Sequence, residues 1–267
     1  EHRLPMCLLA FQWQPGAPAP LTIAANRDEF YARPTTALHA WADGHTVAGQ
    51  DLQGGGTWMG VHRRSGRVAA LTNVRDPAAM RSDAPSRGGI VTAFLHSGLG
   101  AEEFAQQLAG TSAAYNGFNL LLFDGQQLVA FESRQRRFFQ PAPGVWAVSN
   151  ADFDTPWPKL VRLRSGLAAV LQTHQAAQAP EMPPALESDL WPLLADTRLA
   201  ADAELPATGV GLDLERALSA TFICMPHYGT RASTLLHHGR DRVQIIERSF
   251  GPAGAREPTG TVRLRLD

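Results

Sequence analysis

At 267 residues the chain is long enough for one large domain or two small ones. Its formal net charge of −1 provides no basic surplus, so neither nucleic acid nor an anionic membrane is expected as a partner. No apolar run approaches the roughly 18 residues of a membrane-spanning helix. The two cysteines, Cys7 and Cys224, lie far apart, which fits a reducing compartment and predicts a cytoplasmic protein.

The first two predicted strands form a hairpin-like pair. Residues 6–11 and 21–29 are both apolar enough for strands, and the prolines and glycine within residues 12–20 predict a loop between them. This pairing brings the end of the second strand back to the start of the first. The first strand starts with Met6 and Cys7, and the second ends in a polar block, Asn26-Arg27-Asp28-Glu29.

Cys7 is the first candidate for chemistry. A methionine before a small residue is a good substrate for co-translational removal, so a chain that starts at Met6 would mature to one that starts at Cys7. Such a residue carries a thiol nucleophile and an α-amine base together. The α-amine titrates at about 7.7–8.0, and Asp28 could orient it. The alternative is that Cys7 is a buried strand residue, as free cysteines usually are.

Residues 1–6 are interpreted as a tag, a leader or an alternative start, because they lack the apolar core and cleavage site of a signal peptide. The expected domain is therefore a single one over residues 7–267.

Further strands are predicted along the chain. Residues 35–54 are mixed in composition and predicted as loop, and the glycines at 54–56 could bring backbone close to a ligand but lack the lysine of a phosphate loop. Turn residues at 65–66 and 124–125 predict two hairpins. The strands after residue 54 are expected at 57–62, 67–73, 118–123, 127–131, 144–150, 221–224, 232–237, 243–247 and 261–266.

Apolar residues at helical spacing predict helices in two blocks, at 87–96 and 101–109, then at about 157–176, 186–194 and 212–220. The order of strands and helices, with antiparallel hairpins dominant, argues against a parallel fold. It predicts an α+β protein, a four-layer αββα sandwich of two antiparallel sheets with helices outside.

Several strands end in polar residues. Asn73 and Asn150 each close a strand, and Arg231 lies in a turn. Each alone has an ordinary explanation, since Asn is common in turns and arginine is usually at the surface. His237 and His238 are adjacent and therefore a poor ligand pair. A surface strand end is expected for them, and no metal site is predicted.

Together these motifs carry a resemblance. The start Met6-Cys7, the Asn26–Glu29 block, the run from Gly55 to Gly60 and the strand end at Asn73 resemble the NRDE family, which comprises transport and Golgi organisation protein 2-like proteins. Ser149-Asn150 and Gly229-Thr230-Arg231 fit the same family. The resemblance spans nearly the whole chain.

The family is in turn similar to cysteine N-terminal-nucleophile hydrolases, which have an αββα fold and cleave non-peptide C–N bonds. The resemblance implies Cys7 as nucleophile, with Asp28, Asn73, Asn150 and Arg231 as the other catalytic residues. It departs at Ala25, where those hydrolases carry an arginine. Arg27 is close by, but we expect it to point to the other face of the strand.

Two functions remain open. One is an amidohydrolase for a small molecule, with Asn26, Arg27, Glu29 and Trp58 as binding residues. The other, implied for eukaryotic relatives, is a non-catalytic carrier of haem or an acyl-lipid. Neither requires a resident cofactor, and the oligomeric state is left open. A carrier needs an apolar pocket, for which the aromatic residues near the polar block are candidates: Phe30, Tyr31, Trp58, Phe153 and Trp157.

Overall fold

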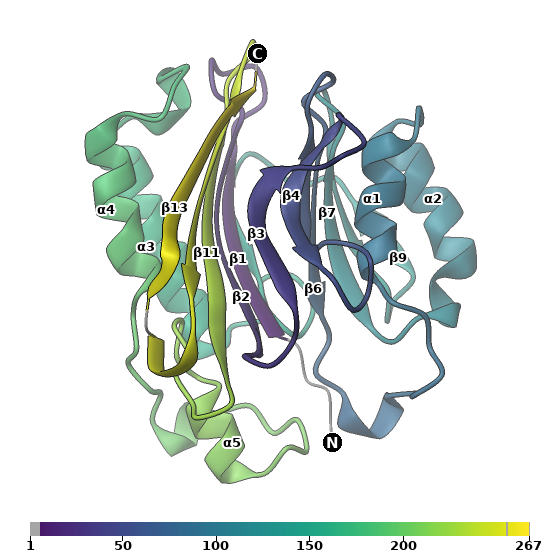
Figure 1. The fold of residues 1–267 in the computed structure, drawn as a ribbon, viewed down its shortest axis with the longest axis vertical. Coiled ribbons are helices and arrows are strands. Elements are labelled where there is room, and N and C mark those ends of the chain that lie inside the picture. Colours follow the sequence, from purple (N-terminus) through teal and green to yellow (C-terminus); the bar gives the residue numbers. More distant parts are fainter. Residues whose placement is uncertain (1–5, 255, 267) are drawn as a thin grey trace.

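The structure is a computed structural model that describes residues 6–254 and 256–266. Within these residues the strands form two antiparallel sheets stacked face to face (Figure 1). The first has the order β10-β1-β2-β11-β12-β13, where the strands are β1 (Met6–Trp13), β2 (Leu21–Phe30), β10 (Gly144–Val148), β11 (Tyr228–His238), β12 (Val243–Phe250) and β13 (Arg256–Leu266). The second runs in chain order from β3 to β9, with β3 (Thr35–Ala40), β4 (Thr46–Asp51), β5 (Met59–His62), β6 (Val68–Asn73), β7 (Phe118–Phe123), β8 (Leu128–Glu132) and β9 (Arg137–Phe139).

Helices cover the outer face of each sheet. Against the second sheet lie α1 (Gly88–His96) and α2 (Ala101–Thr111), and against the first lie α3 (Pro158–Thr173) and α4 (Pro184–Leu194) (Figure 1). The short helix α5 (Leu212–Ala217) lies at the end of the molecule where β1 begins. The predicted four-layer αββα sandwich is confirmed.

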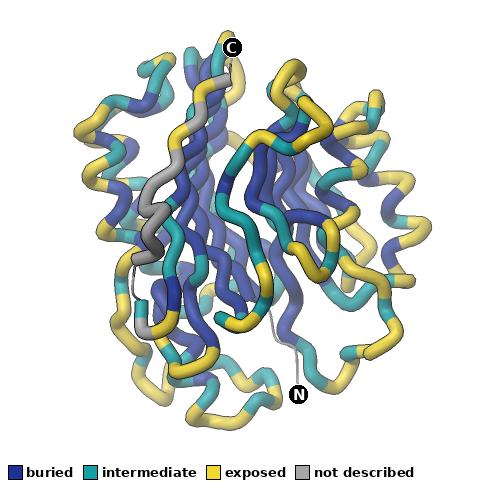
Figure 2. Tube along the Cα trace, in the orientation of Figure 1, coloured by how far each residue is buried: buried dark blue, intermediate teal, exposed yellow. Residues whose placement is uncertain are grey.

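The burial of β1 shows how the sequence builds these layers. Leu9, Phe11 and Trp13 alternate with Leu8 and Ala10 along the strand. The first three contribute to the core between the sheets, and the other two pack towards α3 and α4. Both faces of the strand are therefore buried (Figure 2), which explains its nearly continuous apolar sequence.

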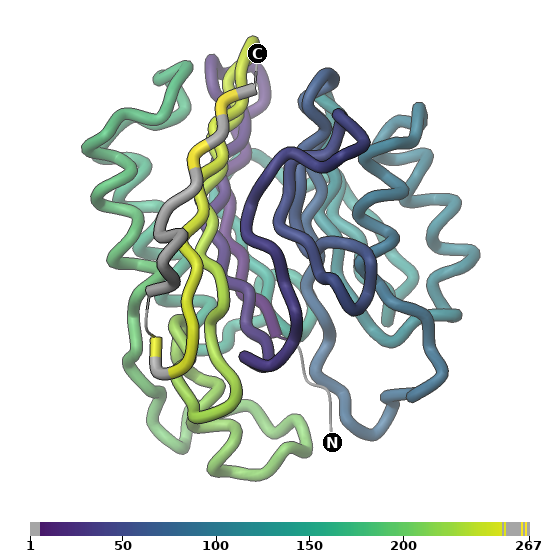
Figure 3. Tube along the Cα trace, in the orientation of Figure 1, coloured from purple at the N-terminus to yellow at the C-terminus, as the bar shows by residue number. Residues whose placement is uncertain are grey.

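Segments far apart in the chain meet at the centre of the first sheet. β2 pairs with β1 on one side and with β11 on the other (Figure 3). In this register Asp28 lies opposite Met6 on β1 and opposite Thr230 on β11. The polar end of β2 thus lies between two strands from opposite ends of the sequence.

Three secondary-structure predictions were wrong. Residues 35–54 contain β3, which is the edge strand of the second sheet, and β4 beside it, and neither strand has a strong apolar pattern. The short strand β9 was also missed. Residues 221–224, by contrast, form no strand. Cys224 makes an isolated bridge with Gly229, and the N–H of Ile223 donates to Thr230 Oγ1, so side-chain and local bonds replace a ladder.

The predicted surface position of the paired histidines was also wrong. His237 and His238 are buried in β11. The ring of His237 bonds Thr22 Oγ1 and the Ala179 carbonyl, and that of His238 bonds the carbonyls of Gly66 and Gly239. Both rings therefore serve as internal hydrogen-bonding groups. No helix in the described residues is long and apolar enough to cross a membrane.

Candidate functional site

Cys7 is the second residue of β1 and is buried. Its cross-strand partner is Arg27, and directly opposed residues of an antiparallel pair share a face. The Cys7 side chain therefore lies on the face between the two sheets, at the end where the Asn26–Glu29 block ends β2. Met6 and Asp28 form the neighbouring pair and face the helices.

Arg27 corrects the expectation that it would point away from Ala25. Residues two apart in a strand share a face, and the pairs Cys7–Arg27 and Leu9–Ala25 both lie on the face between the sheets. The guanidinium of Arg27 lies over the Trp58 ring, 4.3 Å from its centroid. An arginine is thus present on the Cys7 face, two residues from the position where the resemblance placed one.

Asp28 is fully buried between β1 and β11. Its Oδ1 accepts a hydrogen bond from Thr230 Oγ1 at 2.7 Å, whereas its Oδ2 has no hydrogen-bond partner. Burial raises the pKa of this carboxyl to about 6, against the opposing charge of Lys159. Asp28 is therefore an acid whose proton is held unusually firmly, next to the backbone of Met6 and Cys7.

Asn73 and Asn150 approach the same point from β6 and from the end of β10. Asn150 Nδ2 donates to the Asn73 carbonyl at 2.7 Å. Ser149 Oγ lies 3.2 Å from the Cys7 carbonyl and 3.1 Å from Asn150 Oδ1. A continuous chain of contacts thus connects both asparagines to the Cys7 backbone. Ser149 belonged to the matched motif, but was not predicted as a site residue.

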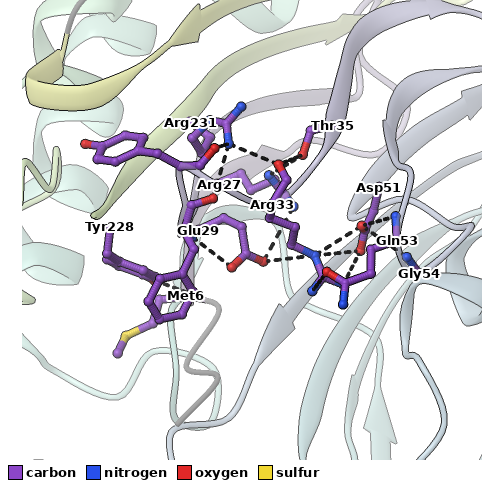
Figure 4. Close-up of polar contacts among 12 residues, drawn as sticks. Met6, Arg27, Glu29, Arg33, Thr35, Asp51, Gln53, Gly54, Tyr228 and Arg231 are labelled. Atoms are coloured by element: carbon purple, nitrogen blue, oxygen red, sulfur yellow. Dashed lines mark hydrogen bonds and ion pairs between the residues drawn. The ribbon is translucent and has the colours of Figure 1, made fainter. Parts of the chain in front are cut away.

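Arg231 is the bulged residue between Thr230 and Ala232 where β11 pairs with β2. Its guanidinium donates to the carbonyls of Phe30, Tyr31 and Arg33 in the turn after β2 (Figure 4). It also donates to the carbonyl of Phe250. These bonds hold the turn that follows β2. Electrostatic support of Cys7 by Arg231 stays a prediction.

The other residues of the polar block form two separate networks. Asn26 donates to the carbonyls of Leu194 and Thr221 and accepts from Ser233 Oγ, so it ties β2 to the helix layer. Glu29 lies 3.6 Å from Arg27 and 3.5 Å from Arg33, which in turn pairs with Asp51 at 2.6 Å (Figure 4). Arg27, Glu29 and Trp58 therefore lie near Cys7, while Asn26 points to the opposite side of the sheet.

Two buried cations near Asp28 were not predicted. Arg75 follows β6 and pairs with Glu215 at 2.6 Å, while its Nη2 lies 3.0 Å from Met6 Sδ. Lys159, in the first turn of α3, is 1% exposed, and its Nζ has no hydrogen-bond partner. Burial lowers the pKa of Lys159 to about 8. The sequence contained a signal for it, because Lys159 is the only lysine among the 24 lysine and arginine residues.

The Cys7 thiol is not activated by its surroundings. Burial, with the charge of Asp28 second, raises the pKa of the thiol to about 12, although Arg27 acts in the opposite direction. A reactive cysteine needs its thiolate. In the chain that retains Met6, the Cys7 thiol is therefore protonated at neutral pH. Nucleophilic chemistry at Cys7 requires a base that takes this proton.

The aromatic residues considered for an apolar pocket belong to different parts of the molecule. Phe153 lies in the core between the sheets with Trp58 against it, while Phe30 packs edge-on against Tyr228 near α5. Trp157 packs towards α3 and stacks with Arg75. In the described residues no group of three histidine, cysteine or acidic side chains is arranged to hold a metal ion.

Comparisons with known proteins cover the same residues. A family model described as Transport and Golgi organisation 2 matches residues 6–252. The chain is 33% identical over 287 residues to the Transport and Golgi organization protein 2 homolog of Bos taurus, covering 98% of this chain and 99% of that protein. The Homo sapiens homolog is 31% identical over 268 residues, covering 92% and 93%. The Drosophila melanogaster protein is 35% identical over 132 residues, 43% of this chain and 45% of that protein.

Proposed function

The chain belongs to the Transport and Golgi organisation 2 family, and we propose that it is a cysteine N-terminal-nucleophile amidohydrolase for a non-peptide C–N bond of a small molecule. The observation that carries this proposal is the convergence of Asp28, Asn73 and Asn150 on the backbone around Cys7, from three different strands or strand ends. A terminal cysteine supplies the nucleophile and the base, and asparagine amides are suitable donors to the oxyanion.

The first chemical step joins the Cys7 sulfur to the substrate carbonyl carbon. The thiol proton passes to the Cys7 α-amine, oriented by Asp28, and then to the leaving nitrogen as the C–N bond breaks. Water next attacks the thioester, which releases the acid and restores the thiol. The scheme needs no redox partner or metal, because one residue supplies the nucleophile and the base.

The oxyanion formed in each step needs hydrogen-bond donors. An asparagine amide carries two N–H groups, so the bond from Asn150 Nδ2 to the Asn73 carbonyl leaves a second donor. We assign the oxyanion to Asn150 and the backbone near Asn73. One such donor contributes about 10²–10³-fold to kcat in comparable sites.

This mechanism requires a free amine at Cys7. While Met6 is attached, the nitrogen of Cys7 is an amide and cannot accept the thiol proton. We therefore propose that the active form is a single domain of residues 7–267, freed of residues 1–6, and that it acts in a reducing compartment such as the cytoplasm. Both cysteines are free, which supports that location. Position 25 holds alanine instead of the arginine of the related hydrolases, which argues against assuming a bile salt or a penicillin as the substrate.

Thiol labelling tests the proposal. We expect intact-mass analysis of native protein to find chains that begin at Cys7. At pH 7.5, iodoacetamide should label Cys7 in those chains faster than a denatured thiol. In the chain that retains residues 1–6, Cys7 should react more than about 100-fold slower than the exposed Cys224, because its thiol pKa is raised.

Substrate turnover provides the second arm. A panel of N-acyl amides with a fluorogenic amine as leaving group should reveal hydrolysis that Cys7→Ala abolishes and the matched control Cys224→Ala retains. A native chain that never begins at Cys7, or a Cys7 that labels no faster than a denatured thiol, would overturn the catalytic proposal.

The carrier alternative draws less support, because the aromatic residues that might line its pocket are divided among separate clusters. It makes its own prediction. A carrier should bind haem or acyl-CoA saturably at micromolar concentrations, measured by absorbance and tryptophan quenching, and the Cys7→Ala variant should bind equally well.

A further inference from the structure

Lys159 is an unusual residue for this chain. The other 23 lysine and arginine residues are all arginines, and arginine is the basic partner in most ion pairs of the described residues, buried or exposed. The one lysine is placed where it is almost fully buried, with no hydrogen-bond partner for its Nζ. An ammonium is a compact charge that can also lose its proton, whereas a guanidinium stays charged and needs a planar partner.

The position of Lys159 relates it to the terminus of the proposed active form. Asp28 Oδ2 is a second buried polar atom without a hydrogen-bond partner, and the charges of Lys159 and Asp28 act strongly on each other. The charge of Lys159 also acts on Cys7. Because Met6 lies opposite Asp28, removal of Met6 would leave the Cys7 α-amine next to this pair.

We propose that Lys159 is a positioning residue for the Cys7 α-amine, and that its positive charge keeps this amine unprotonated and able to accept the thiol proton. The proposal rests on the proposed function only in assuming a free amine at Cys7. Asp28 alone would orient the amine but would also stabilise its charged form. A cation nearby offsets that effect, and it favours onward transfer of the proton to the leaving nitrogen.

Other charged groups surround the amine position and are common to all variants below. Arg75 and Glu215 form an ion pair from the segment after β6 and from α5. The Tyr228 hydroxyl on β11 accepts a hydrogen bond from the Met6 N–H, and Arg27 and Glu29 lie on the other face of β2. None of these is changed in the test, so a change in the titration of the amine reports on Lys159.

The test is an NMR titration of chains that begin at Cys7, produced by a protease that leaves this residue first. Cysteine labelled with 13C and 15N, in a Cys224→Ser background, gives signals from Cys7 alone. We expect Lys159→Met to raise the titration midpoint of the α-amine by about one pH unit, a tenfold gain in basicity. Lys159→Arg should leave the midpoint within about 0.3 unit of the parent.

Arg164→Met is the matched control. It removes a cation from the same helix, one that pairs at the surface with Asp154, and should not move the midpoint. A midpoint unchanged in Lys159→Met, or shifted equally by Arg164→Met, overturns the proposal. The titration needs no substrate. Its outcome is therefore independent of the turnover assays, and a failure of the hydrolase proposal can be told apart from a failure of this one.

A second measurement requires no substitution at Lys159. Since the chain holds one lysine, 13Cε-labelled lysine gives a single signal without assignment. Coupling between two sites is reciprocal, so the Lys159 midpoint should differ between the chain that retains residues 1–6 and the chain that begins at Cys7. Equal Lys159 midpoints in the two chains overturn the proposal. Loss of cooperative unfolding in the chain that begins at Cys7 also overturns it, because the folded protein could then not carry a free amine at Cys7.

Discussion

Arg75 and Glu215 form the most buried ion pair among the described residues, with side chains 2% and 5% exposed. Glu215 also accepts hydrogen bonds from the N–H and hydroxyl of Thr208. Arg75 in turn contacts Met6 and Trp157. The pair therefore joins α5, the start of β1 and the approach to α3 at one point.

We expect Glu215→Ala to lower the free energy of unfolding by about 3–5 kcal/mol, because it leaves the Arg75 charge buried and unpaired. Urea unfolding measures the loss. The double variant Arg75→Met/Glu215→Met should recover most of it, since no charge is then left alone. Asp202→Ala, which breaks an exposed pair with Arg216, should cost far less, because solvent screens both charges. A similar loss in Asp202→Ala and Glu215→Ala would contradict this account.

At the scale of elements, the loop after β4 packs directly on the start of α1. A Cβ at Gly56 would lie 2.4 Å from the Gly88 carbonyl carbon, a distance that real Cβ atoms essentially never show. The glycines at 54–56 were interpreted as a place where backbone could approach a ligand. One of them, Gly56, instead lets backbone approach backbone, two residues before Trp58, which stacks with Arg27.

Gly56→Ala should therefore separate the loop from α1 and destabilise the protein by about 1–3 kcal/mol. Gly89→Ala is the matched control. Gly89 follows Gly88 in α1, and a Cβ at Gly89 would meet nothing within 4 Å. Alanine in a helix is more stable than glycine by about 0.5–1 kcal/mol. Thermal unfolding followed by circular dichroism should move the two midpoints in opposite directions. An unchanged midpoint in Gly56→Ala would refute the close contact.

At the scale of the whole molecule, Glu247 connects the two sheets. It lies in β12 of the first sheet, accepts a hydrogen bond from the Leu38 N–H on β3 of the second, and lies 3.3 Å from Thr234 Oγ1. Burial raises the pKa of Glu247 from 4.5 to about 7. The folded protein thus holds this proton more firmly than the unfolded chain does. The stabilisation that comes from this firmer proton binding is fully present below about pH 4.5 and is lost as the pH rises through about 7.

Glu247→Gln keeps the shape of the neutral acid and cannot ionise. We expect the variant to be close to the parent at pH 5 and more stable than the parent at pH 8.5, by about 2–3 kcal/mol from the linkage relation. Urea unfolding at both pH values measures the difference in the free energy of unfolding between variant and parent. The titration of Asp28 is common to both proteins and cancels from this difference. A difference that does not grow with pH would show that the carboxyl of Glu247 titrates normally.

Much of the candidate site could be predicted from local patterns. Asp28, Asn73 and Asn150 were recognised because polar residues at the ends of apolar strands stand out against their neighbours. Lys159, Arg75 and Ser149 were not, because a basic residue at the start of a helix or a serine after a strand is ordinarily solvated. Their burial depends on which layers close over them, and that information is not local.

The sequence by itself determined the layered fold and most of its strands and helices, because period-two and helical burial patterns and turn residues act over a few neighbouring positions. It did not determine β3, β4 or β9, and it predicted a strand at 221–224 that does not form. It also determined that the start of the first strand lies beside the polar end of the second, since a loop joins the two strands as a hairpin. Only the tertiary structure decided that Arg27 shares the Cys7 face with Trp58 against it, and that the one lysine is buried beside Asp28. Those contacts join residues far apart in the chain, and they depend on how whole layers pack rather than on the local sequence.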